Sequence, residues 1–383
     1  MRVKLGDIFE IGSGGTPSKL HPEYYDGNIP WVKTGDLKAE YLYEVEDYIT
    51  EEGLINSSAK LYEIDTVLVA MYGATIGATS ILKMPACTNQ ACAAFRKNER
   101  VVPEYLYYFL KSQKSRFVKD GVGGAQPNIS ARYLKRVQME LLSIDEQKAI
   151  VNILDKVTNV INKREEEIQF WDNLVKARFV EMFGDPVANE KGWTTKPLLD
   201  MGKCKNGMNF HYDDKGIEIN CLGVGDFKNL SIIDNTEELP TILLNEMPSE
   251  EYLLKDDDIV FVRSNGNKAL VGRSLAVYPG DVPTTFSGFC IRYRKHDNEI
   301  TVPYLLRVLK TDSMRMKMAG RGANIQNLNQ QILGTLVIPV PPVELQNQFA
   351  AFVTEVDKSK VKVQKALDET QKLFDSLMQQ YFG

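Results

Sequence analysis

Two stretches of the sequence place apolar residues three and four positions apart, with lysine, glutamate and asparagine between them. The first stretch begins near Ile153 and the second near Phe352. This spacing puts the apolar side chains on one side of an α-helix. We therefore predict long amphipathic helices over residues 145–182 and 349–381, the first spanning roughly 55 Å at 1.5 Å per residue.

Each predicted helix has one apolar stripe and needs something to pack against along its length. The two helices could pair as an antiparallel coiled coil that holds two globular parts apart, or each could pack on its own globular part as ordinary core. We favour the pair, because the two stripes match and both follow a globular part. The stripe residues expected to make helix or partner contacts are Ile153, Val157, Ile168, Trp171, Phe352, Val356, Leu367 and Phe374.

Outside these helices, short apolar segments of strand length lie between turn signals. We predict strands at residues 67–71, 259–263, 274–277 and 289–293. A helix with a basic flank is predicted after the strands of each globular part, over residues 104–119 and 303–318. This mixture of strands, helices and loops is typical of an α+β fold.

The chain repeats itself when the sequence is shifted by 199 residues, which places Gln147 over Gln346 and Leu154 over Val353. The segment "YLYYFLKSQKSR" then lies over "YLLRVLKTDSMR", and both halves end in Phe-Gly, at Gly184 and Gly383. We therefore expect a pseudo-two-fold repeat of two similar α/β domains, separated by two long helices in an antiparallel coiled coil. The predicted boundaries are 1–143 for the first domain, 144–184 for the central helix, 185–341 for the second domain and 342–383 for the C-terminal helix.

Composition narrows the class of protein. The five cysteines are odd in number and show no C-x-x-C spacing, which favours reduced thiols in a cytoplasmic protein over a zinc site or a disulfide framework. The histidines (His21, His211 and His296) form no ligand motif. We expect no membrane span, because no run of 18 apolar residues occurs, and the start lacks the apolar core of a secretory signal.

Motifs of common enzymes are missing from the sequence. Neither a G-x-x-x-x-G-K-[ST] phosphate loop nor a G-x-S-x-G nucleophile elbow occurs. The acidic residues Asp256 and Asp258 flank a predicted strand without an evident basic or histidine partner, so we interpret them as part of a turn. We predict no catalytic residue, no metal site and no cofactor in this chain.

The glycine-rich stretch "GSGGTPSKL", residues 12–20, could be a turn or a loop that binds phosphate. Its counterpart in the second repeat, "KNGMNFHYD", lacks most of these glycines. A catalytic phosphate cradle would be expected to keep them, so we interpret the stretch as a loop on a binding face whose glycines permit close approach of DNA.

Basic residues gather after the shorter predicted helices. Seven basic residues stand against one acidic residue between Lys111 and Arg136, and five against one between Arg307 and Arg321. Lysine and arginine neutralise DNA phosphates, while asparagine and glutamine can pair with adenine edges. A charged helix face with a polar turn is the alternative, but the recurrence in both repeats favours DNA. The candidate DNA-binding residues are Ser13, Thr16, Ser18, Lys19, Lys33, Thr34, Tyr72, Thr75, Lys114, Arg116, Gln126 and Asn128 in the first repeat, and Asn209, His211, Arg263, Asn265, Asn267, Lys268, Arg273, Arg315, Arg321, Asn324 and Gln326 in the second.

The layout resembles the specificity (S) subunits of type I restriction–modification systems. The resemblance rests on the two-repeat arrangement, the "GSGGTPS…NIPWVKTGDL" opening, the "YGATIG" loop and "GAQPNISARYLKRVQMELLSIDEQKAI" leading into a long helix. It implies a non-catalytic subunit with two target recognition domains, each reading one half of a bipartite site in double-stranded DNA. It also implies that the helices set the half-site spacing and dock two methyltransferase (M) subunits, with restriction (R) subunits able to join. S-adenosylmethionine would belong to the M subunits, and ATP and Mg²⁺ to the R subunits.

Two rival hypotheses remain open at the level of sequence. A coiled-coil scaffold without sequence-specific DNA binding would use the helices alone. A methyltransferase fused to a recognition region would need an N-P-P-[FY] or D-P-P-Y motif, and the chain contains neither.

Overall fold

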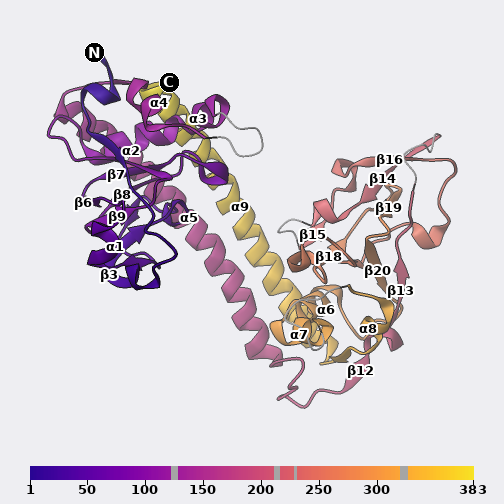
Figure 1. The fold of residues 1–383 in the computed structure, drawn as a ribbon. Helices are drawn as coiled ribbons and strands as arrows, with labels where there is room; N and C mark the ends of the chain where they lie inside the picture. Colours follow the sequence, from indigo (N-terminus) through magenta and orange to yellow (C-terminus); the bar gives the residue numbers. More distant parts are fainter. Residues whose placement is uncertain (122–127, 211–215, 228–230, 320–326) are drawn as a thin grey trace. The chain divides into compact units, whose positions relative to one another are not determined.

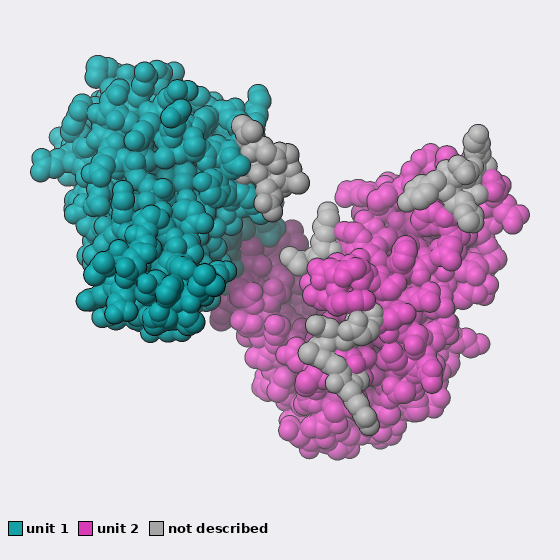
Figure 2. Space-filling model, viewed as in Figure 1, with its two compact units in different colours: residues 1–166, 364–383 teal, residues 167–363 magenta. Residues whose placement is uncertain are grey.

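The computed structural model describes residues 1–121, 128–210, 216–227, 231–319 and 327–383 (Figure 1). The chain divides into two compact units (Figure 2). Unit 1 contains residues 1–166 and 364–383, and unit 2 contains residues 167–363. Each unit therefore combines one globular part with a portion of both long helices.

The globular part of unit 1 is built on a five-stranded and a four-stranded sheet. Strands β7 (Val67–Ala70), β8 (Thr79–Leu82) and β10 (Cys92–Phe95) are buried along their whole length, which explains why β7 and β10 appear in the sequence as continuous apolar runs. The five-stranded sheet has the order β2 (Ile11–Ser13), β10 (Cys92–Phe95), β7 (Val67–Ala70), β8 (Thr79–Leu82), β4 (Tyr41–Leu42). The four-stranded sheet has the order β5 (Tyr48–Ile49), β3 (Tyr25–Val32), β9 (Ala86–Thr88), β6 (Leu61–Tyr62). A separate pair joins β1 (Arg2–Lys4) to β11 (Gln138–Glu140).

Unit 2 repeats this plan. Its five-stranded sheet has the order β13 (Gly202–Asn206), β20 (Cys290–Lys295), β17 (Asp258–Val262), β18 (Ser274–Val277), β15 (Ile232–Ile233). A three-stranded sheet has the order β16 (Thr241–Leu244), β14 (Ile217–Leu222), β19 (Thr284–Phe286), and β12 (Thr195–Pro197) pairs with β21 (Val337–Pro339). The strands predicted at residues 67–71, 259–263 and 274–277 are therefore present, and the strand predicted at 289–293 begins one residue later, at Cys290.

The shorter helices follow the strands in both units. Unit 1 has α1 (Glu51–Ile55), α2 (Pro103–Ser112), α3 (Lys114–Asp120) and α4 (Ala131–Arg136), and unit 2 has α6 (Val302–Leu309), α7 (Asp312–Ala319) and α8 (Gln330–Gly334). The prediction of one helix over 104–119 and one over 303–318 was wrong, because each region contains two helices. In unit 2 the Thr311 hydroxyl accepts a hydrogen bond from the Met314 amide (3.4 Å), so a new helix begins beside a capping residue.

The long helices α5 (Ile144–Phe183) and α9 (Val343–Phe382) each contain 40 residues, which confirms the predicted helical segments. Within unit 1, Leu154 of α5 and Phe374 of α9 belong to the same hydrophobic core, and Arg164 donates hydrogen bonds to the Ala366 carbonyl and the Thr370 hydroxyl. Within unit 2, Lys360 of α9 forms an ion pair with Asp172 of α5 at 2.5 Å. The antiparallel packing of the helices is thus confirmed within each unit.

The alternative of packing on the globular parts is also correct, because the two arrangements coexist. Gln147 near the start of α5 is fully buried: its amide oxygen accepts from the Val102 amide, and its amide nitrogen donates to the carbonyls of Arg100 and Leu142. Its repeat partner Gln346, at the start of α9, makes the same bonds to Thr301, Glu299 and Pro341. One buried glutamine therefore anchors each long helix to its own globular part.

The far end of each helix contacts the globular part of the unit in which that end lies. Phe183 of α5 packs against Tyr304 in unit 2, with ring centres 4.7 Å apart. Phe382 of α9, its counterpart by the 199-residue repeat, packs against Tyr105 in unit 1 at 5.3 Å. Each globular part is thus bound to the start of one long helix and the end of the other, which is the physical form of the pseudo-two-fold repeat.

The interpretation of Asp258 as a turn residue without a basic partner was wrong. Asp258 is fully buried at the start of β17, and both of its carboxylate oxygens accept hydrogen bonds from the Arg294 guanidinium at 2.7 Å. The partner was not evident in the sequence because Arg294 lies 36 residues away on the neighbouring strand β20. The turn itself is present, since Asp257 adopts a left-handed backbone with φ of 69°.

Candidate nucleic-acid interface

Four loops of unit 1 meet at the ends of its buried strands, and backbone hydrogen bonds connect them. The Gly15 amide donates to the Thr88 carbonyl (2.9 Å) and the Met71 amide to the Ala91 carbonyl (2.8 Å). The Ile129 amide donates in turn to the Met71 carbonyl (3.0 Å). The loops at residues 13–19, 89–91, 71–75 and 128–129 therefore form one continuous face.

The loops of unit 2 are joined by the same pattern. The Met208 amide donates to the Phe286 carbonyl (3.2 Å), the Arg263 amide to the Phe289 carbonyl (2.8 Å) and the Leu328 amide to the Arg263 carbonyl (2.8 Å). Because Arg263 and Met71 hold equivalent places in this network, the two faces can be compared residue by residue. We call these surfaces loop face 1 (residues 13–19, 71–75, 89–91 and 128–129) and loop face 2 (residues 206–209, 263–270, 287–289 and 327–328).

The glycine-rich stretch has an intramolecular explanation. A Cβ atom on Gly14 would lie 1.8 Å from the Thr88 carbonyl oxygen, and one on Gly207, its counterpart in unit 2, would lie 2.0 Å from that of Ser287. These distances are far below van der Waals contact, so any side chain there would push the loops apart. The expectation that the glycines admit DNA is therefore replaced by close packing of one loop on another, whereas Ser13, Thr16, Ser18 and Lys19 remain partly or fully exposed.

Every candidate DNA-binding residue that the structure describes is at least partly accessible to solvent. The more exposed members are Ser18, Lys19, Tyr72, Lys114, Arg116, Asn128, Asn209, Asn267 and Lys268. The half-buried members are Ser13, Thr16, Lys33, Thr34, Thr75, Arg263, Asn265, Arg273 and Arg315. The predicted residues Gln126, His211, Arg321, Asn324 and Gln326 lie outside the described residues.

Several of these cations already have partners within the chain. Lys33 lies 2.6 Å from an Asp47 carboxylate oxygen, and the Arg116 guanidinium lies 3.4 Å from Asp120. Arg315 donates to the Val271 carbonyl (3.2 Å), and burial together with the charge of Arg273 lowers the pKa of its guanidinium. These residues help to hold the loops in place, which is compatible with contacts to DNA but would weaken their attraction for phosphate.

The two loop faces differ most at one insertion. Between the equivalent residues Met71 and Ile76 loop face 1 makes a short turn, whereas loop face 2 has a longer loop between Arg263 and Val271. This longer loop is organised by two asparagines: the Asn265 side chain accepts from the Asn267 amide (2.7 Å), and the Asn267 side chain accepts from the Ala269 amide (3.1 Å). Such turns let a polar loop keep a defined shape without regular secondary structure.

The sequence-based list missed residues of the loops that follow β9 and β19. The Thr16 hydroxyl donates a hydrogen bond to the Gln90 side chain, so Gln90 belongs to loop face 1. Phe289 of loop face 2 is 61% exposed although its backbone is held by Arg263. The sequence analysis places Phe289 in the strand predicted at residues 289–293. The neighbouring Gly288, a residue typical of loops, is the sequence feature that indicates a loop at this position.

The helix residues expected to contact partners divide by burial. Val356 and Phe374 are buried within their own units, where they stabilise the helix pair, and Ile153 is exposed. Val157, Ile168, Trp171, Phe352 and Leu367 are half-buried. The structure adds exposed apolar residues that are not among the expected contact residues, namely Val160, Phe170, Val180, Val361 and Leu373.

Among the described residues, no group of three or more histidine, cysteine, aspartate or glutamate side chains is placed to hold a metal ion. All five cysteines lie in described segments and are free thiols. Burial raises the pKa of Cys87 to about 11 and that of Cys92, Cys204 and Cys221 to about 12, so these thiols are protonated at neutral pH. No helix in the described segments combines the length and apolar character needed to cross a membrane.

The chain thus contains two similar globular parts. Each has a polar loop face whose loops are joined by equivalent backbone hydrogen bonds, which defines a protein with two related binding surfaces. The chain belongs to the family described as the type I restriction modification DNA specificity domain, whose model matches residues 1–169 and 190–370. This match confirms the family resemblance and the two-part α/β architecture predicted from the sequence.

The chain is similar to known specificity subunits. It is 32% identical over 226 residues to the type I restriction enzyme MjaIX specificity subunit of Methanocaldococcus jannaschii, and 31% identical over 164 residues to the EcoR124I/EcoR124II specificity subunit of Escherichia coli. These alignments include 54% and 41% of this chain, and 52% and 41% of the respective relatives. An alignment with the StySPI specificity subunit of Salmonella potsdam is longer, at 23% identity over 387 residues, 93% of this chain and 82% of that one.

Solved structures share the fold. The S subunit from M. genitalium matches with a TM-score of 0.54 at 18% identity, covering 100% of this chain and 96% of that one. A chain from a study of the assembly and conformational transition of the type I R-M system matches with a TM-score of 0.61 at 16% identity, covering 100% and 97%.

Proposed function

We propose that this chain is a type I specificity subunit that reads an asymmetric, bipartite target in double-stranded DNA, one half-site for each globular part. The observation that carries the proposal is that the two loop faces share their backbone arrangement but differ in their side chains. Both depend on the same backbone hydrogen bonds, yet their exposed side chains differ. Two copies of one frame with different surfaces are suited to read two different base sequences.

The side chains of each loop face match the chemistry of DNA. Exposed lysines such as Lys19 and Lys268 are suited to phosphate oxygens, and exposed amides such as Asn128 and Asn267 to base edges in the major groove. The chain's part in the reaction is recognition. S-adenosylmethionine would be bound by methyltransferase subunits, and ATP with Mg²⁺ by restriction subunits. A DNA target also implies a cytoplasmic location, as predicted from the cysteines.

The helices α5 and α9 serve in this proposal as spacer and docking surface. Exposed apolar side chains on them, including Phe170 and Val361, offer contact area to two methyltransferase subunits and, through these, to restriction subunits. A helical spacer of fixed length sets the distance between half-sites, and one turn of DNA is about 34 Å. Deleting one or two heptads from both helices should therefore change the length of the non-specific gap.

Methylation mapping tests the proposal directly. The genome of a strain carrying this chain and its methyltransferase partner should show one bipartite methylated motif that disappears when the chain is deleted. Replacing residues 1–143 with the equivalent part of another family member should change one half of the motif and leave the other half intact. If the motif survives deletion, or if the complex shifts all DNA sequences equally in a gel, the scaffold hypothesis replaces this one.

A further inference from the structure

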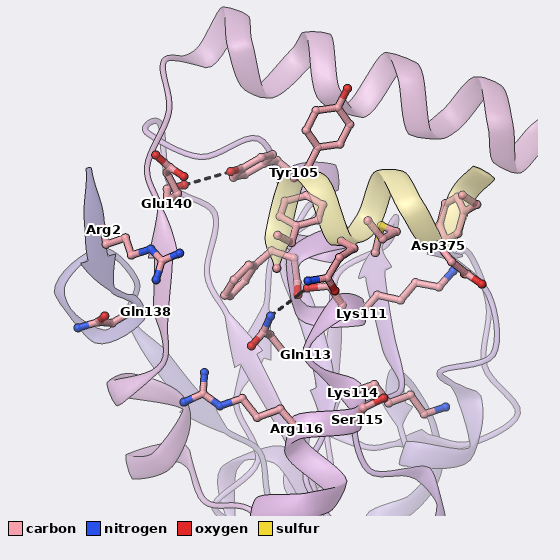
Figure 3. Close-up of a pocket in the computed structure, with 18 of the residues that line it drawn as sticks. Arg2, Tyr105, Lys111, Gln113, Lys114, Ser115, Arg116, Gln138, Glu140 and Asp375 are labelled. Atoms are coloured by element: carbon pink, nitrogen blue, oxygen red, sulfur yellow. Dashed lines mark hydrogen bonds between the residues drawn. The ribbon is translucent and has the colours of Figure 1, made fainter. Parts of the chain in front are cut away.

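Unit 1 contains a groove of about 730 Å³ that lies outside loop face 1 (Figure 3). It lies between the α2–α3 corner, the β1–β11 pair and the last turns of α9. Aromatic and thioether side chains line it from α2 and α9, including Phe109, Phe374 and Met378. Arg2, Lys111, Lys114 and Arg116 line it with positive charge, against Glu140 and Asp375. The groove is thus apolar inside and predominantly basic at its edge.

The internal repeat shows what the same place holds in unit 2. There the corresponding elements are the α6–α7 corner, the β12–β21 pair and the end of α5. The segment at residues 184–193 follows α5 directly. Pro186 of this segment is buried, and Val187 packs against the unit 2 core. The Trp193 indole donates a hydrogen bond to the Phe183 carbonyl at the end of α5 (3.1 Å).

Hydrogen bonds to the Asp185 carboxylate stabilise the conformation of this segment. The Asp185 carboxylate accepts hydrogen bonds from the amides of Val187 (2.8 Å) and Ala188 (3.0 Å). Although burial opposes it, hydrogen bonding to the Ser313 side chain and to these amides holds the pKa of Asp185 below its usual value. By the 199-residue repeat, Ser313 corresponds to Lys114, which lines the groove of unit 1. An acidic residue bound in the groove would therefore meet a lysine where Asp185 meets a serine.

The residues at the ends of the two long helices differ in burial. The end of α5 in unit 2 is covered by the segment at residues 184–193, whereas the end of α9 borders the groove in unit 1. Phe183 is 2% exposed at the end of α5, whereas its counterpart Phe382 in α9 is only half-buried. No described residue of unit 1 occupies the position that Pro186 and Val187 occupy in unit 2. The accessible apolar surface of the groove is formed by the half-buried Tyr381 and Phe382, beside the buried Phe109, Phe374 and Met378.

We propose that the groove of unit 1 binds an irregular peptide segment of a partner protein, in which an acidic residue is followed within two positions by proline or an aliphatic residue. The acidic side chain would lie against Lys114 and Arg116, and the apolar one against Tyr381 and Phe382. This proposal goes beyond DNA recognition and does not depend on it. Duplex DNA is the competing ligand, because Lys114 and Arg116 are also candidate phosphate contacts.

A labelled peptide with the sequence of residues 184–193, GDPVANEKGW, provides the probe. Added to the full-length chain, it should bind saturably, with a Kd on the order of 10–100 µM in fluorescence anisotropy. Unit 2 already holds this segment within its own chain at a high effective concentration, so the added peptide should occupy unit 1. Peptides in which the aspartate is changed to lysine, or the valine to aspartate, should bind at least about tenfold more weakly.

Paired protein variants locate the site. Lys114→Glu should weaken peptide binding by about tenfold or more, whereas Lys119→Glu, the same charge change elsewhere on α3, should not. Equal effects of the two substitutions, or no saturable binding to the wild-type chain, would overturn the proposal. A photo-reactive group in place of the valine should cross-link to α3 or α9, and cross-links confined to unit 2 would also overturn it. If a short duplex displaces the wild-type peptide competitively, the groove is assigned to DNA instead.

Discussion

The two globular parts differ where they are exposed and agree where they are buried. The anchor bonds of Gln147 recur at Gln346, and the Tyr105 hydroxyl donates to the Glu140 carbonyl as Tyr304 does to Pro339. The loop faces, by contrast, differ in length and in nearly every exposed side chain. A frame that does not depend on its loops allows the binding surface to change without loss of the fold, which is what two different half-sites require.

The comparison extends to the charges that support the central strands. At the start of β17 in unit 2, Asp258 is fully buried against Arg294. At the same corner of unit 1, Asp65 pairs with Lys83 (2.8 Å) and Lys97 (3.0 Å) in a partly exposed network. Equivalent corners of the fold are thus held by an ion pair whose carboxylate is fully buried in one unit and partly exposed in the other.

The largest expected difference between the two units comes from breaking the ion pair of Asp258. Asp258→Asn should lower the free energy of unfolding of unit 2 by about 2–3 kcal/mol, because the fully buried Asp258 loses its charge and the Arg294 guanidinium, which is 27% exposed, loses its counter-charge. Asp65→Asn should cost only about 0–1 kcal/mol, since solvent screens the pair and asparagine tolerates the left-handed backbone there. Urea unfolding of both variants measures this difference, and equal losses would show that the two corners are energetically alike.

The glutamine anchors should behave alike in both units. Gln147→Met and Gln346→Met each keep the side-chain length but leave one amide and two carbonyls without partners. We expect each substitution to lower the free energy of unfolding by about 2–4 kcal/mol, because buried backbone groups without hydrogen bonds are costly. Losses that differ by more than about 1 kcal/mol would mean that the equivalence of the two anchors is geometric only.

The sequence predicted the long helices and the buried strands because both leave strong periodic signals. Leu154 and Val353 lie on stripes that repeat every three or four residues, and β7 is a run of buried apolar residues. The 199-residue repeat alone shows that Gln147 and Gln346 occupy equivalent positions. These features depend on local pattern, so a single chain reveals them.

The parts that sequence reasoning missed depend on contacts between distant residues. The partner of Asp258 lies on another strand, and the role of Gly14 depends on the Thr88 carbonyl 74 residues away. For the same reason, the sequence alone could not show which of the candidate DNA-binding residues already have partners within the chain. The sequence indicates Arg116 and Lys33 as cations that could contact DNA phosphates. In the fold, Arg116 forms an ion pair with Asp120 and Lys33 forms one with Asp47.

A middle-sized effect is expected from the exposed aromatic residue that distinguishes loop face 2. Phe289→Ala should weaken binding of the assembled complex to its target by about tenfold, because an apolar contact with a base edge, such as a thymine methyl group, would be lost. The loss should concern discrimination in the second half-site alone, measured with duplexes altered in one half-site at a time. Leu243→Ala, an exposed apolar change on β16 of the same unit, is the control and should leave affinity unchanged. A uniform loss over all duplexes would instead indicate a contact with the DNA backbone.

The smallest effect should come from a pair of equivalent lysines, Lys111 and Lys310. Burial and the neighbouring charge of Arg307 lower the pKa of Lys310 to about 8, whereas the Lys111 side chain is more exposed and lies near Glu40. Between pH 8 and the ordinary lysine pKa of 10.5, the folded state has released a proton that the unfolded state still binds, so raising the pH through this window stabilises the fold. The stability of the wild type relative to Lys310→Met should therefore rise by about 1 kcal/mol from pH 7.5 to 10, after allowance for partial exposure. Lys111→Met should change this pH slope less, and an equal change would show that the charge of Arg307 has no influence on its neighbour.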